Sequence, residues 1–307
     1  MQKKNPKRPV HGILILDKPL NISSNQALQT ARRLFQAEKA GHGGSLDRLA
    51  NGLLPVFFGE ATKFSQVLLE ANKEYLTTAT LGIKTASSDA EGEIIQRCEN
   101  FSVSLEQLQS VLSEFLGETQ QIPSMFSALK FQGKPLYELA RQGIEIERAA
   151  RTISIKKLDL IAYENNLVTL QVQCSKGTYI RNLVEDIGNK LECGAHVSML
   201  RRLNAGPFVE AQMITLDTLQ TILDEKGLAG LDDLLLPVDA ALVNYPVMKL
   251  NEEDTRKISL GQIVTPLTLY QPGVYRTYNV QHKFIGLSEI KEDHRLYAKR
   301  MISTNSQ

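Results

Sequence analysis

The pattern of apolar and polar residues predicts a strand and then a helix at the start of the chain. Residues 10–16 are mostly apolar and end at Asp17-Lys18-Pro19, which is typical of a short buried strand. Residues 23–25, Ser-Ser-Asn, then offer N-cap side chains to a helix. The apolar residues of this helix fall on one face: Ala27, Leu28, Ala31, Leu34 and Phe35. Residues 1–9 are polar and basic, and we expect a loose tail there.

The same patterns predict three further strands and three further helices. Apolar positions alternate with polar ones over residues 166–174, as expected of a half-buried antiparallel strand, and residues 74–82 and 152–161 are also predicted strands. Ser104 to Gln107 is a capping-box pattern that opens a helix ended by Gly117. The remaining helices are predicted over residues 135–143 and directly after Tyr179.

The order of these elements favours an α+β fold. Strands and helices are interspersed without strict alternation, which indicates a mixed or antiparallel central sheet with flanking helices. Residues 228–241 are predicted to be a linker, and residues 261–302 contain short strand patterns separated by turn residues. We therefore expect a large domain over residues 1–245 and a small β-rich domain over residues 246–307.

The distribution of charge is uneven although the net charge is only +1. Residues 1–40 contain eight Lys and Arg against two acidic residues, whereas residues 217–254 contain nine acidic residues against two Lys. This asymmetry is compatible with a polyanion bound on one face, and equally with ordinary solvated surface charge.

Cysteine content and hydropathy limit the class of protein. The three cysteines are far apart and form no CxxC pair, which disfavours a disulfide framework and a structural zinc site. No apolar run approaches the roughly 18 residues that span a bilayer, and residues 12–16 are too few for a signal peptide. We expect a cytoplasmic protein that binds no metal, and a monomer because no interface stripe is visible.

Candidate chemistry concentrates in the glycine-rich segment over residues 41–52, which contains four glycines around His42 and Asp47. The glycines allow close approach to a ligand or positive φ angles. The segment is not a phosphate-binding P-loop, since no Gly-Lys-Ser/Thr follows, and it has no pair of metal ligands. From spacing alone, a tight turn in which Asp47 caps the next segment remains an alternative to a functional site.

A family resemblance adds to this reading. Residues 41–52, Gly-His-Gly-Gly-Ser-Leu-Asp-Arg-Leu-Ala-Asn-Gly, resemble the signature loop of the TruB-type tRNA pseudouridine synthases. Further family motifs are similar and occur in family order over about residues 10–205. These motifs are Leu16-Asp-Lys-Pro19, Gly59-Glu-Ala-Thr-Lys63, Lys73-Glu-Tyr75, Gln121 to Lys130, Cys174 to Arg181, and Gly194 to Leu203. Within the loop, this chain has Gly43, Ser45, Arg48 and Asn51 where the family usually has Thr, Ala, Pro and Thr.

The resemblance implies that the protein isomerises uridine 55 in the T-loop of tRNA to pseudouridine. That conversion breaks the N1–C1′ bond, turns the base over and joins C5 to C1′, so the resemblance implies no cofactor. A carboxylate either attacks C1′, as in retaining glycosidases, or adds to C6 of the base. By resemblance this carboxylate is Asp47 and Arg181 is its ionic partner. Arg48, which replaces the family's usual Pro beside Asp47, adds a charge that depresses the Asp47 pKa or binds phosphate.

The resemblance also implies how RNA is held. Tyr75 stacks on the target base and assists proton removal, Tyr179 and Leu200 line the uracil pocket, and His42 fills the space left by the flipped base. Residues 125–150 resemble an RNA-clamping insertion, and the C-terminal segment resembles a PUA RNA-binding domain by its position and β-rich texture. The candidate phosphate or shape contacts are Lys18, Lys130, Arg141, Arg201 and Arg202.

Two other functions remain alternatives at the level of sequence. A tRNA-binding folding chaperone with little or no catalysis would use the same pocket, and the altered loop residues leave this reading open. A nucleoside hydrolase or glycosidase would need a second carboxylate, for which Asp89 and Glu91 are available. These two residues resemble a family surface loop.

Overall fold

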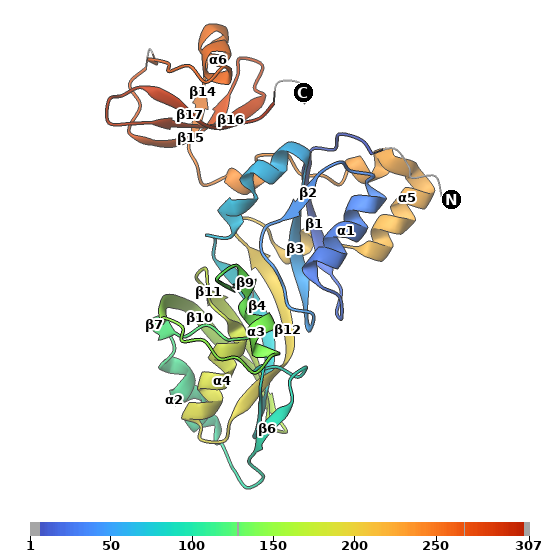
Figure 1. The fold of residues 1–307 in the computed structure, drawn as a ribbon, viewed down its shortest axis with the longest axis vertical. Coiled ribbons are helices and arrows are strands. Elements are labelled where there is room, and N and C mark those ends of the chain that lie inside the picture. Colours follow the sequence, from blue (N-terminus) through green and yellow to red (C-terminus); the bar gives the residue numbers. More distant parts are fainter. Residues whose placement is uncertain (1–6, 128, 267, 304–307) are drawn as a thin grey trace.

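A large mixed sheet forms the centre of the molecule in the computed structural model, which describes residues 7–127, 129–266 and 268–303 (Figure 1). Eight strands follow one another in the order β13-β1-β3-β12-β4-β11-β10-β7, and β2 pairs with β3. The strands are β1 (Gly12–Lys18), β2 (Ala40–His42), β3 (Ala50–Phe58), β4 (Lys73–Leu81), β7 (Gly117–Gln121), β10 (Arg151–Glu164), β11 (Leu167–Cys174), β12 (Ala195–Ala205) and β13 (Ile214–Thr215). Most pairs are antiparallel, whereas β1–β13 and β3–β12 are parallel.

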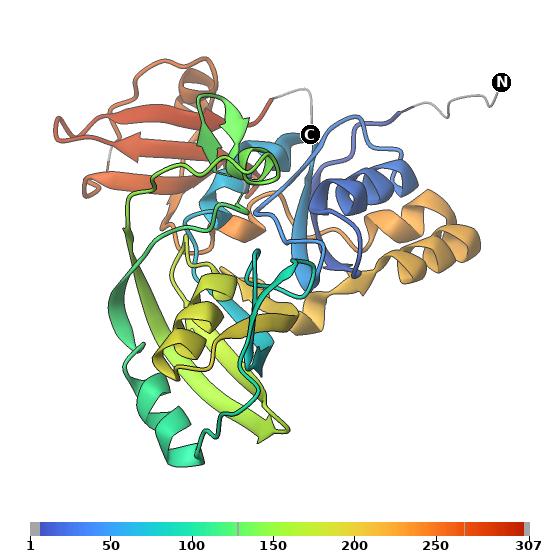
Figure 2. The same cartoon turned by 60° about the horizontal axis from the view of Figure 1, so that its bottom comes forward.

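Helices cover this sheet in two groups. The first group is α1 (Ser24–Leu34) and α5 (Leu216–Asp232), which lie side by side and close a core with β1 and β3 (Figures 1 and 2). The second group is α2 (Leu105–Ser113) and α4 (Ile180–Lys190), which pack on the half of the sheet made by β4, β10, β11 and β12. The predicted mixed sheet with flanking helices is confirmed.

A smaller β-rich unit follows at the C-terminal end. Its four strands are ordered β14-β15-β16-β17 and surround a separate apolar core together with one helix. The elements are β14 (Val247–Lys249), α6 (Glu252–Ser259), β15 (Gly273–Tyr278), β16 (Phe284–Ile290) and β17 (Leu296–Met301). Figure 1 shows this unit as a distinct lobe above the large sheet.

Short elements complete the fold outside these two sheets. A 3₁₀ helix, η1, connects β3 to β4, and two small hairpins and a five-residue helix lie in the connections between longer elements. Their bounds are η1 (Gly59–Leu68), β5 (Ile83–Thr85), β6 (Ile94–Arg97), β8 (Lys130–Phe131), β9 (Lys134–Pro135), α3 (Leu136–Ala140), η2 (Glu210–Gln212) and η3 (Ala240–Leu242). The helix predicted over residues 135–143 is therefore shorter than expected.

The glycine-rich segment is less of a loop than the sequence suggested. Residues 40–42 and 50–58 are strands, so that only residues 43–49 form the loop itself. Gly52 adopts φ +96°, and a Cβ built there would lie 2.3 Å from the main-chain oxygen of Arg202. Glycine is thus required where β3 passes close to β12. Because glycine is not typical of strands, the sequence pattern did not predict β3.

The prediction that residues 228–241 form a linker is wrong. Its first five residues belong to α5, which bends at Gly227 where φ is 66°. Leu231 is fully buried, and Leu236 exchanges main-chain hydrogen bonds with Ile13 of β1 at 2.9 Å in both directions. These residues seal the N-terminal core instead of bridging two domains.

Candidate active site

The loop of residues 43–49 holds Asp47 at the edge of the sheet, between β2 and β3. Ser24 of α1 fixes the residue before Asp47, since its hydroxyl accepts from the main-chain N–H of Leu46 at 2.7 Å and donates to the Leu46 carbonyl at 3.0 Å. The N–H of Gly43 donates to the carbonyl of Pro55 at 3.0 Å. Contacts from α1 and β3 therefore position the loop.

Arg181 is the ionic partner of Asp47. It lies in the first turn of α4, and its Nε is 2.9 Å from the Asp47 Oδ2. The Arg181 side chain is 5% exposed, whereas that of Asp47 is 44% exposed. The carboxylate is therefore open to an incoming ligand, while its partner is fixed by the protein.

A second carboxylate, Asp89, also faces Arg181. Its Oδ2 is 3.4 Å from Nη1 of Arg181, and its Oδ1 accepts hydrogen bonds from the Ser87 hydroxyl at 2.6 Å and the Glu91 N–H at 3.1 Å. Asp89 is buried, so the expectation that it lies in a surface loop was wrong. The sequence did not predict the contact between Asp89 and Arg181, because no local pattern around residue 89 indicates a partner on a helix far along the chain.

Two main-chain carbonyls complete the surroundings of Arg181. Its Nη1 donates to the Ser87 oxygen at 3.1 Å and its Nη2 to the Phe126 oxygen at 2.9 Å. The guanidinium is thus held by the segment after β5, the segment after β7 and the loop of residues 43–49 together, and its orientation toward Asp47 is pre-set.

The pKa of the Asp47 carboxyl is raised above its ordinary value. The largest cause is desolvation, because protein encloses the group on most sides even though solvent reaches its oxygens. Arg181 opposes this shift, Asp89 reinforces it and Lys18 opposes it. Because 44% of the Asp47 side chain remains exposed to solvent, desolvation is incomplete and the rise in its pKa is correspondingly limited.

Tyr75 and Leu200 lie on one face of the sheet and belong to the same apolar cluster as Leu46 of the loop. Tyr75 on β4 is directly opposite Arg202 on β12, and Leu200 on β12 is opposite Thr77. Both Tyr75 and Leu200 are buried and pack in one core cluster with Leu46 of the loop. Burial raises the pKa of the Tyr75 phenol, with Arg202 opposing, so the phenol is protonated at neutral pH and suits stacking and hydrogen bonding.

His42 and Tyr179 flank the loop and the start of α4. Within the described residues, the buried Nδ1 of His42 has no hydrogen-bond partner. Burial lowers the pKa of His42, and Arg202 lowers it further, so the ring is neutral and can stack on a base. Tyr179 is the N-cap residue of α4, and its N–H and carbonyl are both bound by the side chain of Gln121, at 2.8 and 3.1 Å.

Two of the predicted phosphate contacts are inaccessible. Lys18 is fully buried, its Nζ donates to the carbonyls of Pro19 at 2.9 Å and Ile22 at 2.8 Å, and burial lowers its pKa to about 8. Arg202 is 1% exposed, and its guanidinium binds the carbonyls of Leu53, Ser45 and Gly44. The expectation that these two residues touch RNA phosphates is therefore corrected, since neither charge reaches the surface.

The other three predicted contacts differ in accessibility. Arg201 is partly exposed, but its guanidinium forms a two-pronged ion pair with Asp17, at 3.0 and 2.9 Å, and a further pair with Glu210. Lys130 and Arg141 are exposed in the insertion after β7, where Arg141 stacks 5.6 Å from the Tyr137 ring centroid. Lys130 and Arg141 are thus the accessible cations of the predicted set.

The unusual residues of the loop have local explanations at two positions. A Cβ at Gly43 would lie 2.8 Å from Leu68 Cδ1 and 2.9 Å from Phe57 Cε2, so the neighbouring packing excludes the Thr that is usual in the family. Arg48 donates from Nη2 to the Asn21 carbonyl at 3.1 Å and is exposed. Its guanidinium therefore binds a main-chain carbonyl at the surface. The pKa of Asp47 is set mainly by burial and by the charges of Arg181, Asp89 and Lys18.

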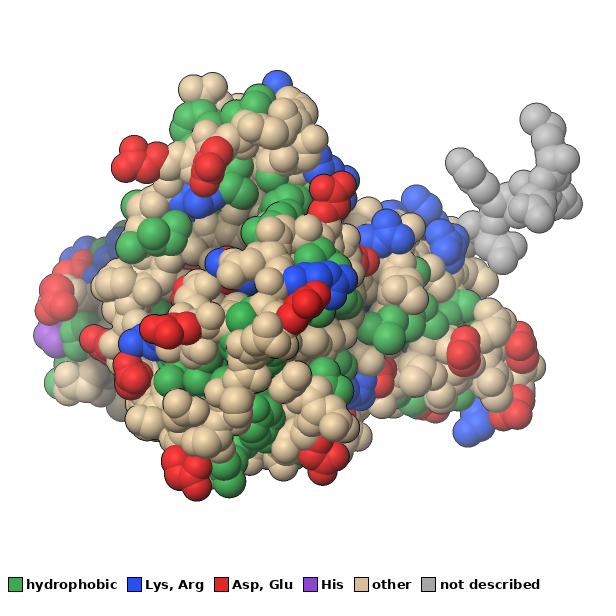
Figure 3. Space-filling model, turned by 90° about the horizontal axis from the view of Figure 1, so that it is seen from below, with side chains coloured by type: hydrophobic (Ala, Val, Ile, Leu, Met, Phe, Trp, Pro, Cys, Tyr) green, Lys and Arg blue, Asp and Glu red, His purple; other side chains and the backbone are tan. Residues whose placement is uncertain are grey.

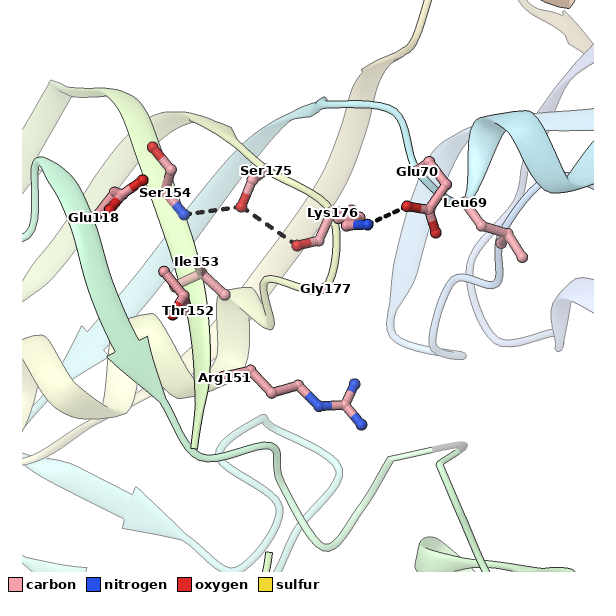
Figure 4. A pocket seen from close by; sticks show the side chains of 10 residues that line it. All are labelled: Leu69, Glu70, Glu118, Arg151, Thr152, Ile153, Ser154, Ser175, Lys176 and Gly177. Atoms are coloured by element: carbon pink, nitrogen blue, oxygen red, sulfur yellow. Dashed lines mark hydrogen bonds and ion pairs between the residues drawn. The ribbon is translucent and has the colours of Figure 1, made fainter. Parts of the chain in front are cut away.

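A surface recess of about 520 Å³ lies beside β10 and β11 and contains none of the predicted site residues (Figure 4). Arg151 points into it, and Lys176 is paired with Glu70 across it. Glu118 also lines the recess, so two acidic and two basic residues balance there. Acidic and basic side chains are likewise interspersed over the face in Figure 3. We therefore assign the chemistry to Asp47 and its neighbours instead of to this recess.

The described residues contain neither a cluster of metal ligands nor a membrane-spanning helix. In residues 7–127, 129–266 and 268–303, no three His, Cys, Asp or Glu side chains gather in a way that could hold a metal ion. Over the same ranges, no helix has the length and apolar character needed to cross a bilayer.

Comparison with known proteins covers nearly the whole chain. A family described as TruB family pseudouridylate synthase (N terminal domain) matches residues 32–180. The tRNA pseudouridylate synthase B C-terminal domain matches residues 181–243, and the Pseudouridine synthase II TruB C-terminal family matches residues 246–302.

Individual relatives and solved structures agree with these matches. The tRNA pseudouridine synthase B of Pseudomonas paraeruginosa is 49% identical over 301 residues, covering 98% of this chain and 99% of that protein. The protein of the same name from Mannheimia succiniciproducens is 48% identical and covers 96% of this chain and 97% of its own length. A crystal structure of a Cbf5-Nop10-Gar1 complex matches with a TM-score of 0.73 at 25% identity, covering 95% of this chain and 84% of that one. The resemblance seen in the ordered motifs is thus confirmed, and the chain belongs to the TruB family of pseudouridylate synthases.

Proposed function

We propose that this protein isomerises uridine 55 in the T-loop of tRNA to pseudouridine, with Asp47 as the catalytic carboxylate. The relatives from Pseudomonas and Mannheimia carry the name of a tRNA pseudouridine synthase. The single observation that carries the residue assignment is the 2.9 Å ion pair between the accessible Asp47 and the buried Arg181. A solvent-open carboxylate held by a fixed cation is the arrangement that a nucleophile requires.

The proposed reaction is an isomerisation without redox change. The base is flipped out of the T-loop, which costs a few kcal/mol of unstacking. The ionised carboxylate of Asp47 then attacks C1′ or adds to C6, the N1–C1′ bond breaks, the base turns over, and C5 bonds to C1′. The bond to Asp47 breaks again and regenerates the carboxylate, the C5 hydrogen leaves as a proton, and N1 takes up a proton. Since no electron or group is gained or lost, we expect no cofactor.

The neighbouring side chains divide the remaining tasks. Tyr75 and Leu200 form the buried wall against which the uracil ring stacks, and the protonated Tyr75 phenol donates a hydrogen bond there. Tyr179 closes the pocket at the start of α4. The neutral His42 ring fills the space that the flipped base leaves in the T-loop.

RNA binding involves surfaces outside the pocket. We propose that residues 125–150 clamp the T-stem and loop, with the exposed Lys130 and Arg141 contacting phosphates. We further propose that the catalytic domain ends near residue 245 and that residues 246–307 are a PUA-like RNA-binding domain. We expect the enzyme to act as a monomer in the cytoplasm.

Tritium release tests this function directly. An unmodified tRNA transcript with tritium at C5 of uridine is incubated with excess protein, and release to water counts turnover. We expect release from the T-loop site and a rate at least about 10³-fold lower for Asp47→Asn, with tRNA binding retained.

The other outcomes are equally informative. Normal turnover by Asp47→Asn would show that another group is the nucleophile. Tight tRNA binding by the wild-type protein without any release would instead support the alternative of a tRNA folding chaperone.

A further inference from the structure

Arg202 is a buried arginine whose charge has no acidic partner. Its side chain is 1% exposed, and in the part of the chain that the structure describes it forms no ion pair. A buried charge without a counter-ion is costly unless many polar groups solvate it. Such a residue therefore calls for an explanation from what it contacts.

The contacts of Arg202 join the catalytic loop to the sheet. Nη2 donates to the Gly44 carbonyl at 3.1 Å and Nη1 to the Ser45 carbonyl at 3.4 Å, three and two residues before Asp47. Nε donates to the Leu53 carbonyl of β3 at 2.7 Å. One planar guanidinium thus connects the first half of the loop to β3, a geometry that the single nitrogen of a lysine cannot reproduce.

Arg202 also adjoins the pocket from the other side. It lies directly opposite Tyr75 in the β12–β4 pair, on the face of the sheet that bears Leu200. Its charge opposes the effect of burial on the pKa of Tyr75 and adds to the lowering of the His42 pKa. The side chain therefore reaches the loop, the stacking residue and the sheet from one central position.

We infer that Arg202 is a positioning residue for catalysis, which braces the loop so that Asp47 stays within reach of Arg181 and of the bound uridine. This inference rests on the proposed function of Asp47. Reacting groups displaced by about 1 Å lose on the order of 10²-fold in rate. A brace of three hydrogen bonds on main-chain atoms limits such displacement without touching the RNA.

Arg202→Lys tests the brace because it keeps the charge and removes the fork. We expect the single-turnover rate of tritium release at saturating protein to fall about 10- to 100-fold, with the Kd for tRNA within about two-fold. Because a displaced Asp47 loses the help of Arg181, we also expect the acid limb of the pH–rate profile to move to higher pH. A purely structural role would reduce the folded fraction and leave this limb in place.

A matched control is Arg8→Lys, because the Nε of Arg8 also donates to a main-chain carbonyl, that of Phe35 at 3.0 Å, far from the loop. We expect its rate to stay within about two-fold of wild type. Thermal unfolding of both variants establishes that the assay temperature lies below each midpoint.

A second variant acts from the acceptor side in case Arg202→Lys does not fold. Gly44 has φ +123°, and a Cβ there would make only ordinary contacts, at 3.8 Å from both Arg202 Nη1 and Leu69 Cδ2. Gly44→Ala should shift the carbonyl that Arg202 binds and raise the acid limb in the same way. If folded Arg202→Lys or Gly44→Ala keeps the wild-type rate and pH profile while Asp47→Asn is inactive, the brace is refuted and the proposed function stands. Activity of Asp47→Asn would refute the proposed function instead.

Discussion

At the scale of single residues, burial sets the chemistry of the site more than sequence type does. Lys18 and Arg202 have the residue types of phosphate contacts, yet both are buried and bind main-chain carbonyls. Asp89 has the residue type of a surface acid, yet it is buried against Arg181. Three charged residues thus act on Asp47 or on its loop from inside the protein, where solvent screens them little.

The pH dependence of the reaction follows from these charges. Catalysis requires ionised Asp47, so the rate falls as pH drops through its pKa. That pKa is raised above the ordinary 3.8, chiefly by burial, so the acid limb should lie above pH 3.8. Lys18→Met removes a charge that lowers the Asp47 pKa, and Asp89→Asn removes one that raises it. We expect the limb to move up in the first variant and down in the second, measured by single-turnover tritium release between pH 4 and pH 9.

The opposite directions make the two variants controls for each other. A general loss of packing would move the acid limb of both variants in the same direction or would leave it unchanged in both. Movement of both variants in the same direction would contradict the assignment of the limb to Asp47.

At the scale of elements, one close approach between strands determines where the loop ends. β3 and β12 run parallel, with Gly52 beside Arg202 in register. The chain passes so tightly that a Cβ on Gly52 would overlap the Arg202 main chain. The strand that holds the brace and the strand that ends the catalytic loop are therefore packed without room for a side chain.

Gly52→Ala should lower the free energy of unfolding far more than Gly177→Ala. Both glycines have a positive φ, but only Gly52 lacks space for a Cβ. Gly52 has φ +96° and a Cβ clash at 2.3 Å, whereas Gly177 has φ +76° and nothing within 4 Å. Alanine at positive φ costs about 1 to 2 kcal/mol, and overpacking adds about 1 to 3 kcal/mol more. The free energy of unfolding from urea titration checks this order, and equal losses in both variants would contradict the close approach.

At the scale of the whole molecule, only two of the five cations predicted to contact RNA are exposed, and both lie outside the pocket. Lys130 and Arg141 are exposed in the insertion, whereas Arg201 is neutralised by Asp17 and Glu210. Acidic residues are interspersed with basic ones over the surface in Figure 3. We therefore expect recognition of tRNA to depend on particular exposed side chains more than on a uniformly basic face.

Salt dependence separates the accessible cations from the buried ones. Lys130→Ala and Arg141→Ala should each weaken tRNA binding and reduce the slope of log Kd against log salt by about one. Arg202→Lys should leave this slope unchanged, because its charge is buried and does not displace counter-ions. Filter binding from about 50 to 200 mM salt measures the slopes. An unchanged slope for both Lys130→Ala and Arg141→Ala would mean that the insertion does not contact phosphates.

The sequence by itself determined the features that depend on local pattern and on the order of motifs. The N-cap within residues 23–25, the capping box at Ser104 and the apolar faces of α1, α2 and α4 follow from residues a few positions apart, and the structure confirms them. The ordered motifs likewise led to the family that the comparisons establish.

Only the tertiary structure decided which charges are buried and what they bind. Arg202 and Ser45 are 157 residues apart, Arg181 and Ser87 are 94 apart, and no local pattern encodes such contacts. The sequence did not predict β3, because Gly52 is required by the close approach of β12, a strand far away in the sequence. It did not predict the end of α5, because Leu231 is buried in a core formed by residues of β1 and α1. Burial depends on how the whole chain packs. A lysine or arginine that would bind a ligand at the surface instead binds main-chain carbonyls when it is buried.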